Sequence, residues 1–410
     1  MQPLARFRAA GLLGLAAALL VTACASPPTS VPTPSSGGAS LPPSAAPSLT
    51  TPPADACAVQ VLNGMNEGER VGQLFLLGLA DDELGPAERD AILTDHVGSV
   101  WFTAKSQAGG PAIRSVADAV QAITAGEPPG SGDSGVGLFI AANQEGGLVQ
   151  ALDGPGFSRI PSALAQGSIA AATLQADART WGTQLKKAGI NLDFAPVTDV
   201  VPPGTDQANA PIGTLDREYG HSPAAVAAHA AAFVKGMSAA GVLTVAKHFP
   251  GLGRVTGNTD DVAGVVDRQT TSSDPYLAAF RTVIGAPVPF VMVALATYTK
   301  IDPTALAAFS PIVIRTVLRA KLGFTGIVMS DDLGATAAVQ AIPPATRAID
   351  FVAAGGEMII SKTVDATVEM AVALTARASS DPAFRMLVNT AALHVLELKD
   401  QAHLLTCSNP

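Results

Sequence analysis

Two short stretches of the chain bring together side chains suited to nucleophilic or acid–base chemistry. Residues 247–261, KHFPGLGRVTGNTDD, place a Lys and a His at the end of an apolar run, ahead of three Gly and a group of Asn, Thr and Asp. Residues 329–334, MSDDLG, place two carboxylates directly after another apolar run. A half-buried carboxylate needs hydrogen bonds or a nearby cation, and Lys247 is a candidate for that cation. We therefore expect one of Asp331 and Asp332 to cap the following helix and the other to face a pocket.

The side chains of Lys247 and His248 are suited to binding hydroxyl groups, since an ammonium donates hydrogen bonds and an imidazole donates or accepts them. The alternative for His248 is a purely structural role. In the segment that follows, the glycines at 251, 253 and 257 suit a mobile loop. The alternative for that segment is a surface turn rich in Asn, Thr and Asp.

The elements that must position these residues alternate between short apolar runs and Ala-rich helical stretches, a pattern typical of βα units around a parallel sheet. Together they predict an α/β fold, a single (β/α)₈ TIM-type barrel. An open doubly wound sheet is the alternative, but no GxGxxG motif follows the first run. The eight runs predicted as strands are 71–79, 99–103, 136–142, 190–196, 242–246, 289–295, 326–330 and 357–361.

Active sites of such barrels lie at the carboxyl ends of the strands. Polar residues do gather after the predicted strands: Asn143, Gln144, Glu145, Asp199, Lys247, His248, Asp331 and Asp332.

Composition limits the classes of ligand. The 410 residues carry a formal net charge of −9, and no block of Lys or Arg follows the first few residues, so a nucleic-acid partner is not expected. A neutral or small ligand fits better. No His, Cys or Asp cluster has metal-ligand spacing along the chain, so neither a metal nor an organic cofactor is expected.

The first residues predict a targeting signal rather than a folded element. Arg6 and Arg8 precede an apolar stretch that is too short to span a membrane as a mature helix, and Val21-Thr22-Ala23-Cys24 looks like a bacterial lipobox. An ordinary signal peptide with a chance Cys is the alternative.

The predicted domains are a lipoprotein signal peptide (1–23), a disordered tether rich in Pro, Ser and Ala (24–56) and a barrel (57–410). Cys24 would carry the lipid and hold the protein at the extracytoplasmic face of the cell membrane, with no other contact to the membrane. The remaining pair, Cys57 and Cys407, lies at the two ends of the barrel domain. We expect a disulfide there, and two unrelated thiols are the alternative.

Several motifs resemble those of glycoside hydrolase family three. LRAKLGFTGIVMSDDLG resembles the family's active-site signature, and ERVGQLF, NQEGGLVQ, IGTLDREYG and KHFPG resemble four further motifs in the family's order. The resemblance covers nearly all of residues 57–405. It is closest to the single-domain β-N-acetylglucosaminidase branch, which is NagZ-like and includes actinobacterial lipoproteins.

The resemblance implies a role for each matching residue. Asp331 matches the catalytic nucleophile, and Arg217 matches an Arg that holds the sugar. Lys247 and His248 match ligands of sugar hydroxyls. Asn143 stands where the family usually has an Asp that contacts the sugar, and it could bind the same hydroxyls without charge.

The chain departs from this branch at the proton donor. The branch usually carries an Asp and, two residues later, a His in the loop after KHFPG, but Asn258 and Asp260 stand at those places here. An Asn can orient a partner only by a neutral hydrogen bond. Asp260, or its neighbour Asp261, could act as the acid if bound substrate keeps it protonated. Leu295 and Glu357 also replace a His and an Asp that are common in the family.

The resemblance implies a retaining exo-β-N-acetylglucosaminidase that acts on peptidoglycan-derived glycans by double displacement, as a monomer. Two alternatives stay open. One is a sugar-binding lipoprotein with weak or no turnover, which the missing dyad favours. The other is a β-N-acetylglucosaminide phosphorylase, in which phosphate replaces water as the acceptor.

Overall fold

Eight parallel strands form the centre of the structure, a computed structural model that describes residues 56–126 and 132–407. Their order is β12-β9-β7-β6-β3-β2-β1-β13, and a bridge from Met329 to Met358 joins the two end strands. Each run predicted as a strand overlaps one of them, and β7 extends three residues beyond its predicted run, so the predicted barrel is confirmed. The strands are β1 (Phe75–Leu79), β2 (Ser99–Phe102), β3 (Phe139–Ala142), β6 (Leu192–Asp193), β7 (Leu243–Phe249), β9 (Phe290–Val293), β12 (Ile327–Ser330) and β13 (Ile359–Ser361).

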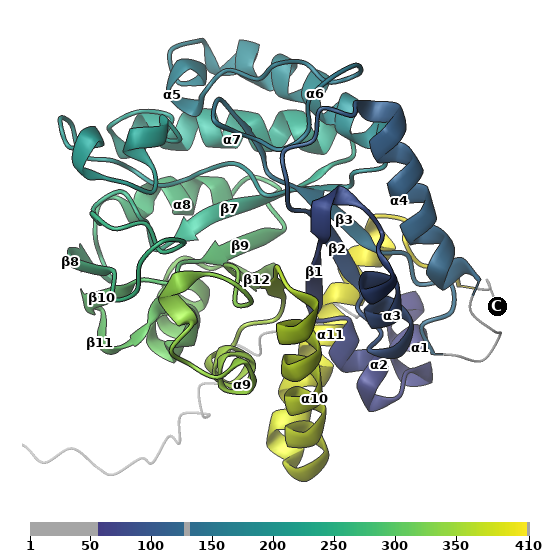
Figure 1. The fold of residues 1–410 in the computed structure, drawn as a ribbon. Coiled ribbons are helices and arrows are strands. Elements are labelled where there is room, and N and C mark those ends of the chain that lie inside the picture. Colours follow the sequence, from purple (N-terminus) through teal and green to yellow (C-terminus); the bar gives the residue numbers. More distant parts are fainter. Residues whose placement is uncertain (1–55, 127–131, 408–410) are drawn as a thin grey trace, which may run out of the picture. The chain divides into compact units, whose positions relative to one another are not determined.

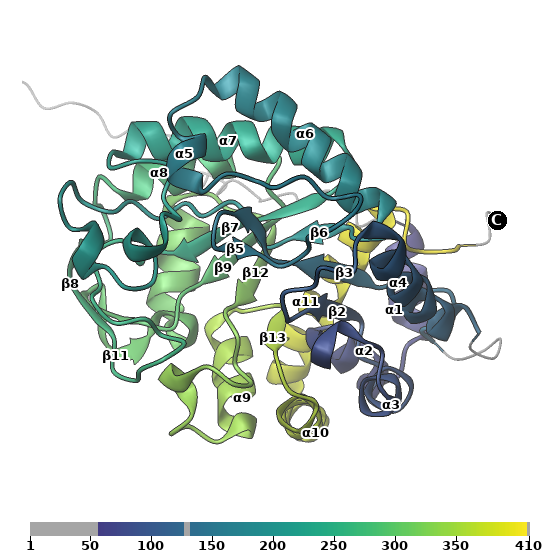
Figure 2. The same cartoon turned by 45° about the horizontal axis from the view of Figure 1, so that its top comes forward.

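Helices surround the ring of strands (Figures 1 and 2). Local sequence fixes where they begin; for α7, the Ser222 side chain accepts a hydrogen bond from Ala225 N, and Pro223 occupies the first turn. The outer helices are α3 (Pro86–Thr94), α4 (Gly110–Ala125), α5 (Ala163–Gln166), α6 (Ala171–Lys187), α7 (Pro223–Ala239), α8 (Leu277–Ile284), the helical segment Ile312–Lys321, α9 (Pro344–Ala354) and α10 (Val364–Ser380). The chain begins with α1 (Ala56–Gly64) and α2 (Glu67–Gly72) and ends with α11 (Pro382–Gln401).

Two small sheets are inserted after barrel strands, and the sequence did not predict either of them. One is the hairpin of β4 (Gln144–Gly146) and β5 (Val149–Gln150), directly after β3. The other joins β8 (Val266–Thr271), β10 (Thr297–Lys300) and β11 (Asp302–Leu306), which follow β7 and β9. Both lie in connections that leave the carboxyl ends of strands.

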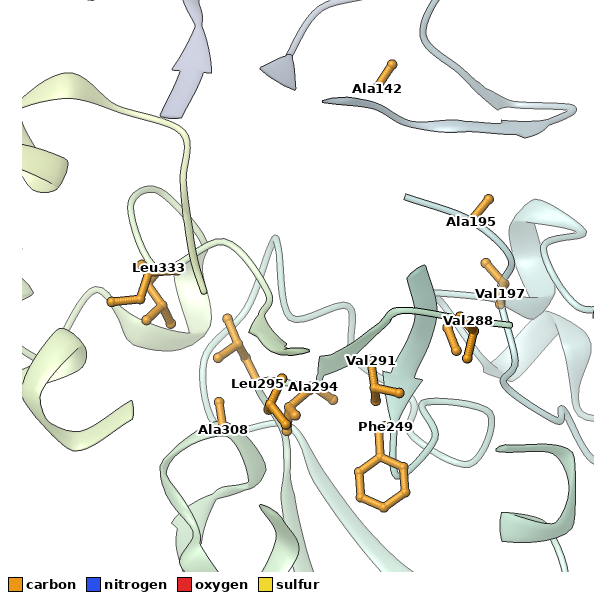
Figure 3. Packing of buried hydrophobic residues seen from close by; sticks show 14 of the residues in the cluster. Ala142, Ala195, Val197, Phe249, Val288, Val291, Ala294, Leu295, Ala308 and Leu333 are labelled. Carbon is orange, nitrogen blue, oxygen red and sulfur yellow. The ribbon is translucent and has the colours of Figure 1, made fainter. Parts of the chain in front are cut away.

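Successive side chains along each strand point into and out of the barrel, and this alternation divides the core into two layers. Leu76, Phe139 and Met329 belong to the cluster inside the barrel. Residues of the opposite register, such as Val291, pack in the cluster between strands and helices (Figure 3). Leu295 lies in this outer cluster beside Ala294, and it is fully buried (Figure 3). The side chain that replaces the family's His is therefore part of the core.

Helix α11 covers the amino ends of the first barrel strands. Val395 belongs to the cluster inside the barrel. The Lys399 ammonium donates to Gln73 Oε1 (2.7 Å) and Gly98 O (2.8 Å), just before β1 and β2 begin. Burial lowers the pKa of Lys399 to about 7. The end of the barrel opposite the strands' carboxyl ends is thus filled by the last helix of the chain.

A disulfide joins Cys57, in α1, to Cys407, with their Cα atoms 5.8 Å apart. The structure therefore links the two ends of the described chain. Residues 1–55, which include the predicted signal peptide, Cys24 and nearly all of the predicted tether, lie outside the described residues, so those remain predictions. Within the described part, no helix is both long and apolar enough to cross a bilayer.

The Lys399 amine predicts a pH dependence of stability. Because its pKa is lower in the folded protein than in the unfolded chain, the unfolded state binds more protons between about pH 7 and pH 10. The free energy of unfolding should therefore rise with pH over that window, by up to ~1.4 kcal/mol per unit. Denaturant titrations of wild type and Lys399→Met should show that the variant lacks this rise. An equal slope in both proteins would refute the assignment.

Candidate active site

A cavity of about 450 Å³ lies at the carboxyl ends of the barrel strands. Its walls come from the β3, β7 and β12 ends and from the long connections after β6 and β7. All seven residues predicted for substrate binding or catalysis line it: Asn143, Arg217, Lys247, His248, Asp260, Asp261 and Asp331.

The Glu145 carboxylate organises the cationic side of the cavity. Arg217 donates to both of its oxygens, from Nη2 at 2.7 Å and from Nε at 2.8 Å, and Lys247 Nζ lies 2.6 Å from Oε1. Burial alone would raise the pKa of Glu145, but Arg217 and Lys247 hold it at about 2. Two buried cations are thus fixed by one carboxylate that is ionised at all ordinary pH values.

This geometry corrects the prediction for Lys247. The Lys ammonium does not pair with Asp331 or Asp332; its partners are Glu145 and Asn143, whose Oδ1 accepts a hydrogen bond at 2.9 Å. The β3 end supplies both partners because Asn143 and Glu145 lie two residues apart, while the β7 end supplies the lysine.

A neighbouring buried acid adds to this group. Asp193, at the end of β6, accepts a hydrogen bond from Gln144 N at 3.0 Å through Oδ1, whereas Oδ2 has no partner. Burial raises its pKa to about 7.

His248 is held by a buried carboxylate. Its Nδ1 lies 2.8 Å from Asp199 Oδ2, and Asp199 Oδ1 accepts from Leu252 N at 2.7 Å. The ring orientation and the start of the next loop are therefore set by the same side chain.

The beginning of that loop is anchored, contrary to the expectation of a mobile loop starting at its glycines. A Cβ on Gly253 would lie 2.0 Å from Val200 O, so the glycine serves close packing. Asn209 Nδ2 donates to Leu252 O and Val255 O, at 2.8 and 2.7 Å. The segment that carries Arg217 is thereby fastened to the loop after β7.

The two adjacent aspartates divide their roles as the sequence predicted, except that Asp332 fixes a turn instead of capping a helix. Asp332 accepts hydrogen bonds from Gly334 N, Ala335 N and Lys362 N, which fixes the turn after β12. Asp331 faces the cavity, and among the described residues only Asp332 N donates to its carboxylate. Burial raises the pKa of Asp331; His248 opposes the rise and the charge of Asp260 adds to it.

The loop with the two candidate proton donors closes over the cavity. Thr259 O and Asp260 O accept hydrogen bonds from Ala338 N and Ala337 N, beyond β12. Asn258 donates to Asp261 Oδ2 at 2.8 Å, the neutral hydrogen bond that an Asn can supply. The charge of Asp260 acts on both Asp331 and Arg217, and both Asp260 and Asp261 line the cavity.

Glu357, the other departure from the family pattern, lies outside the cavity lining. It pairs with Arg319 Nη2 at 2.5 Å and with His394 Nδ1 at 2.7 Å, and it accepts from Val328 N. The Glu thus joins β12 to surrounding helical segments, a structural role.

Comparison with known proteins identifies this arrangement. Residues 68–398 match the glycosyl hydrolase family 3 N-terminal domain. The chain belongs to glycosyl hydrolase family 3. It is therefore a glycoside hydrolase, as its motifs predicted.

Relatives of this hydrolase share its sequence and its fold. A β-hexosaminidase of Stenotrophomonas maltophilia is 32% identical over 297 residues, which cover 70% of this chain and 82% of the relative. The crystal structure of a β-N-acetylhexosaminidase from Beutenbergia cavernae is 47% identical, with a TM-score of 0.79 over 82% of this chain and 99% of that one. LpqI of M. tuberculosis is 26% identical, with a TM-score of 0.68 over 83% and 95% of the two chains.

Sequence reasoning missed the residues that hold the hydrolase site in place. Glu145 and Asp199 were noted only as polar residues after strands, and Asn209 was not noticed. Their partners are Arg217, His248 and Leu252, which lie 43 or more residues away along the chain. For Glu145, the only signal was its position two residues after Asn143, at the end of the same strand.

The Glu145 group predicts a large effect of a single substitution. Glu145→Gln leaves two buried cations without their counter-ion, which should destabilise the hydrolase by about 3–5 kcal/mol. Denaturant unfolding at neutral pH measures this, with the exposed Glu83→Gln as the control that should change little. A loss below ~1 kcal/mol would show that Glu145 does not hold the site together.

The same carboxylate predicts acid sensitivity. Because its folded-state pKa of about 2 lies below that of an unfolded Glu, it stabilises the protein above about pH 4.3. That contribution is lost as the pH falls toward 2. Wild type should therefore lose more stability than Glu145→Gln between about pH 5 and pH 2 in acid titrations followed by circular dichroism. Parallel curves would contradict the pairing.

Proposed function

We propose that this hydrolase is a retaining, exo-acting β-N-acetylglucosaminidase that removes terminal N-acetylglucosamine from peptidoglycan-derived glycans. The observation that carries the proposal is the Asp331 carboxylate, which faces the cavity opposite a fixed set of hydroxyl ligands. The relatives named β-hexosaminidase and β-N-acetylhexosaminidase support the choice of sugar.

The cavity suits one sugar unit with part of its aglycone. Its volume falls within the range of about 300–1,000 Å³ usual for small-ligand sites. Lys247, His248 and Arg217 offer donors to sugar hydroxyls. Trp101 also lines the cavity, and its indole N–H has no hydrogen-bond partner among the described residues, so it can donate to a bound polar group.

The reaction would run in two steps. An oxygen of Asp331 attacks the anomeric carbon while the bond to the aglycone oxygen breaks, and a carboxylic acid gives that oxygen its proton. The carboxylate left by that proton transfer then takes a proton from water, whose oxygen attacks the same carbon and releases Asp331. Both steps invert the centre, so the product keeps the β-configuration.

Asp260 is the better placed of the two candidate donors. Its charge acts on Asp331 and Arg217, whereas the Asp261 carboxylate accepts a hydrogen bond from Asn258. In this scheme Asp260 gives the proton, and Asp261 is engaged by Asn258.

The sugar-binding alternative rests on the same loop, since Asn258 and Asp260 stand where the branch usually has the Asp and the His. The phosphorylase alternative is less favoured. Phosphate would have to approach a cavity already lined by Asp260, Asp261, Asp331 and Asp332.

Steady-state hydrolysis of para-nitrophenyl β-N-acetylglucosaminide across about pH 4 to 8 tests the proposal. Asp331→Asn should abolish turnover. Asp260→Asn should lower kcat/KM by ~10²–10⁴-fold, and Asp261→Asn should lower it less. The acid limb of the wild-type profile should lie above the usual pKa of an Asp, because burial raises the pKa of Asp331.

Leaving-group dependence separates a proton donor from a structural residue. A dinitrophenyl glycoside needs little protonation, so Asp260→Asn should regain most of its activity on that substrate. Equal losses on both substrates would remove Asp260 from the donor role. Sugar binding by calorimetry without any turnover would select the receptor reading, and formation of sugar 1-phosphate on adding phosphate would select the phosphorylase.

The proposal includes a location. We infer that Cys24 carries a diacylglyceryl anchor that holds the enzyme at the outer face of the cell membrane, where peptidoglycan fragments are within reach of the tether. Labelled palmitate fed to producing cells should enter wild type and not Cys24→Ala. Equal labelling of both would rule out Cys24 as the lipid site.

A further inference from the structure

A second cluster of ionisable side chains lies outside the cavity, on the segment that carries Arg217. Asp206, Glu218 and His221 each offer a ligand atom, and these atoms lie within 4.8 Å of one another. None of the three lines the cavity, and the proposed reaction uses none of them.

Glu218 is the unusual member of this cluster. It is fully buried, and among the described residues no donor group bonds either of its carboxylate oxygens; the side chain beside it is another acid, Asp206. Such a group is costly to bury as an anion. Either a proton or a cation must therefore neutralise the charge of the Glu218 carboxylate.

The neighbours of Glu218 form an open shell around that position. His221 Nδ1 lies 3.4 Å from Asp206 Oδ1, an oxygen without a hydrogen-bond partner. The side chains of His221 and Asp206 are 36% and 28% exposed, which leaves a route from solvent to the buried carboxylate. Asp216 adds a further negative charge nearby.

We propose that Asp206, Glu218 and His221 bind a divalent cation of the zinc class. One imidazole nitrogen and two carboxylates are ligands that Zn²⁺ accepts, with water completing the shell, whereas Mg²⁺ and Ca²⁺ prefer oxygen ligands alone. The sequence predicted no metal because the three residues are spread over sixteen positions without a known spacing motif. The fold brings them together.

The cation would stabilise the segment that carries Arg217, which is proposed to bind the sugar. A Cβ on Gly213 would lie 2.7 Å from Asp206 Cα, so the two short turns of this segment already pack closely. Glu218 directly follows Arg217, whose guanidinium is bound to Glu145. A metal that joins Asp206 to Glu218 and His221 would link the two ends of the segment that contains Arg217. Its role would be to hold the Arg217 side chain in position.

A second cluster has the same residue types as the Asp206, Glu218 and His221 cluster, but its Glu is bonded differently. Glu69, His96 and Asp133 also lie within 4.8 Å. Both Glu69 oxygens, however, already accept backbone N–H groups, from Asn66 at 2.6 Å and from Gly132 at 2.9 Å. Asp133 Oδ2 pairs with His96 Nδ1 at 2.9 Å, and Asp133 Oδ1 is the one carboxylate oxygen of this cluster without a hydrogen-bond partner among the described residues. Because the protein already bonds Glu69, this cluster supplies a matched control.

Zinc titration of the chelator-treated chain from Pro52 onward, a compact unit with its own core, tests the proposal. Calorimetry should show one Zn²⁺ per chain, and the melting temperature should rise with zinc concentration. Glu218→Gln and His221→Ala should each weaken zinc binding about tenfold or more. Mg²⁺ at the same concentrations should not compete.

Two control variants separate this site from other zinc-binding groups. Asp133→Asn alters the satisfied cluster and Asp260→Asn alters the cavity, and both should bind zinc as wild type does. Absence of stoichiometric binding in wild type overturns the proposal. So does unchanged binding in Glu218→Gln and His221→Ala, which would mean that a proton satisfies Glu218. Because the readout is zinc binding, the result does not depend on whether the enzyme turns over the proposed substrate.

Discussion

The active site depends on one buried carboxylate. Glu145 binds the Arg217 guanidinium through two hydrogen bonds and the Lys247 ammonium at 2.6 Å, and these two cations are the groups proposed to hold the sugar. Ions taken out of water are stable only when they are paired and hydrogen-bonded, so none of the three can move without exposing the others to a large penalty. The cationic wall of the cavity is therefore preorganised before any substrate arrives.

The barrel supplies the remaining constraint, because parallel strands deliver their carboxyl ends to one face. Glu145 comes from the β3 end, Lys247 and His248 come from β7, and Asp331 follows β12. Side chains such as Asp199 and Asn209 then fasten the long connections to these ends. At the opposite end α11 fills the barrel, so the cavity and the stabilising helix occupy different faces.

The sequence predicted the barrel strands well, but it predicted the contacts between distant residues poorly. The strands were predictable because apolar runs of five to nine residues recur between Ala-rich helices, and the division of Asp331 and Asp332 followed from the cost of a buried carboxylate. The partner of Lys247 was predicted wrongly, and Asn209 was missed, because those contacts join residues far apart in sequence. The β8, β10 and β11 sheet was missed for a related reason: it pairs β8, in the connection after β7, with β10, in the connection after β9.

In the proposed mechanism Asp331 forms a covalent bond to the sugar. The most direct measurement is mass spectrometry of the protein after brief incubation with a slow, fluorinated β-N-acetylglucosaminide that carries a good leaving group. We expect one glycosyl unit per chain, located by peptide mapping on Asp331 and absent from Asp331→Asn. Cleavage of the substrate with no adduct, or an adduct on another residue, would contradict it.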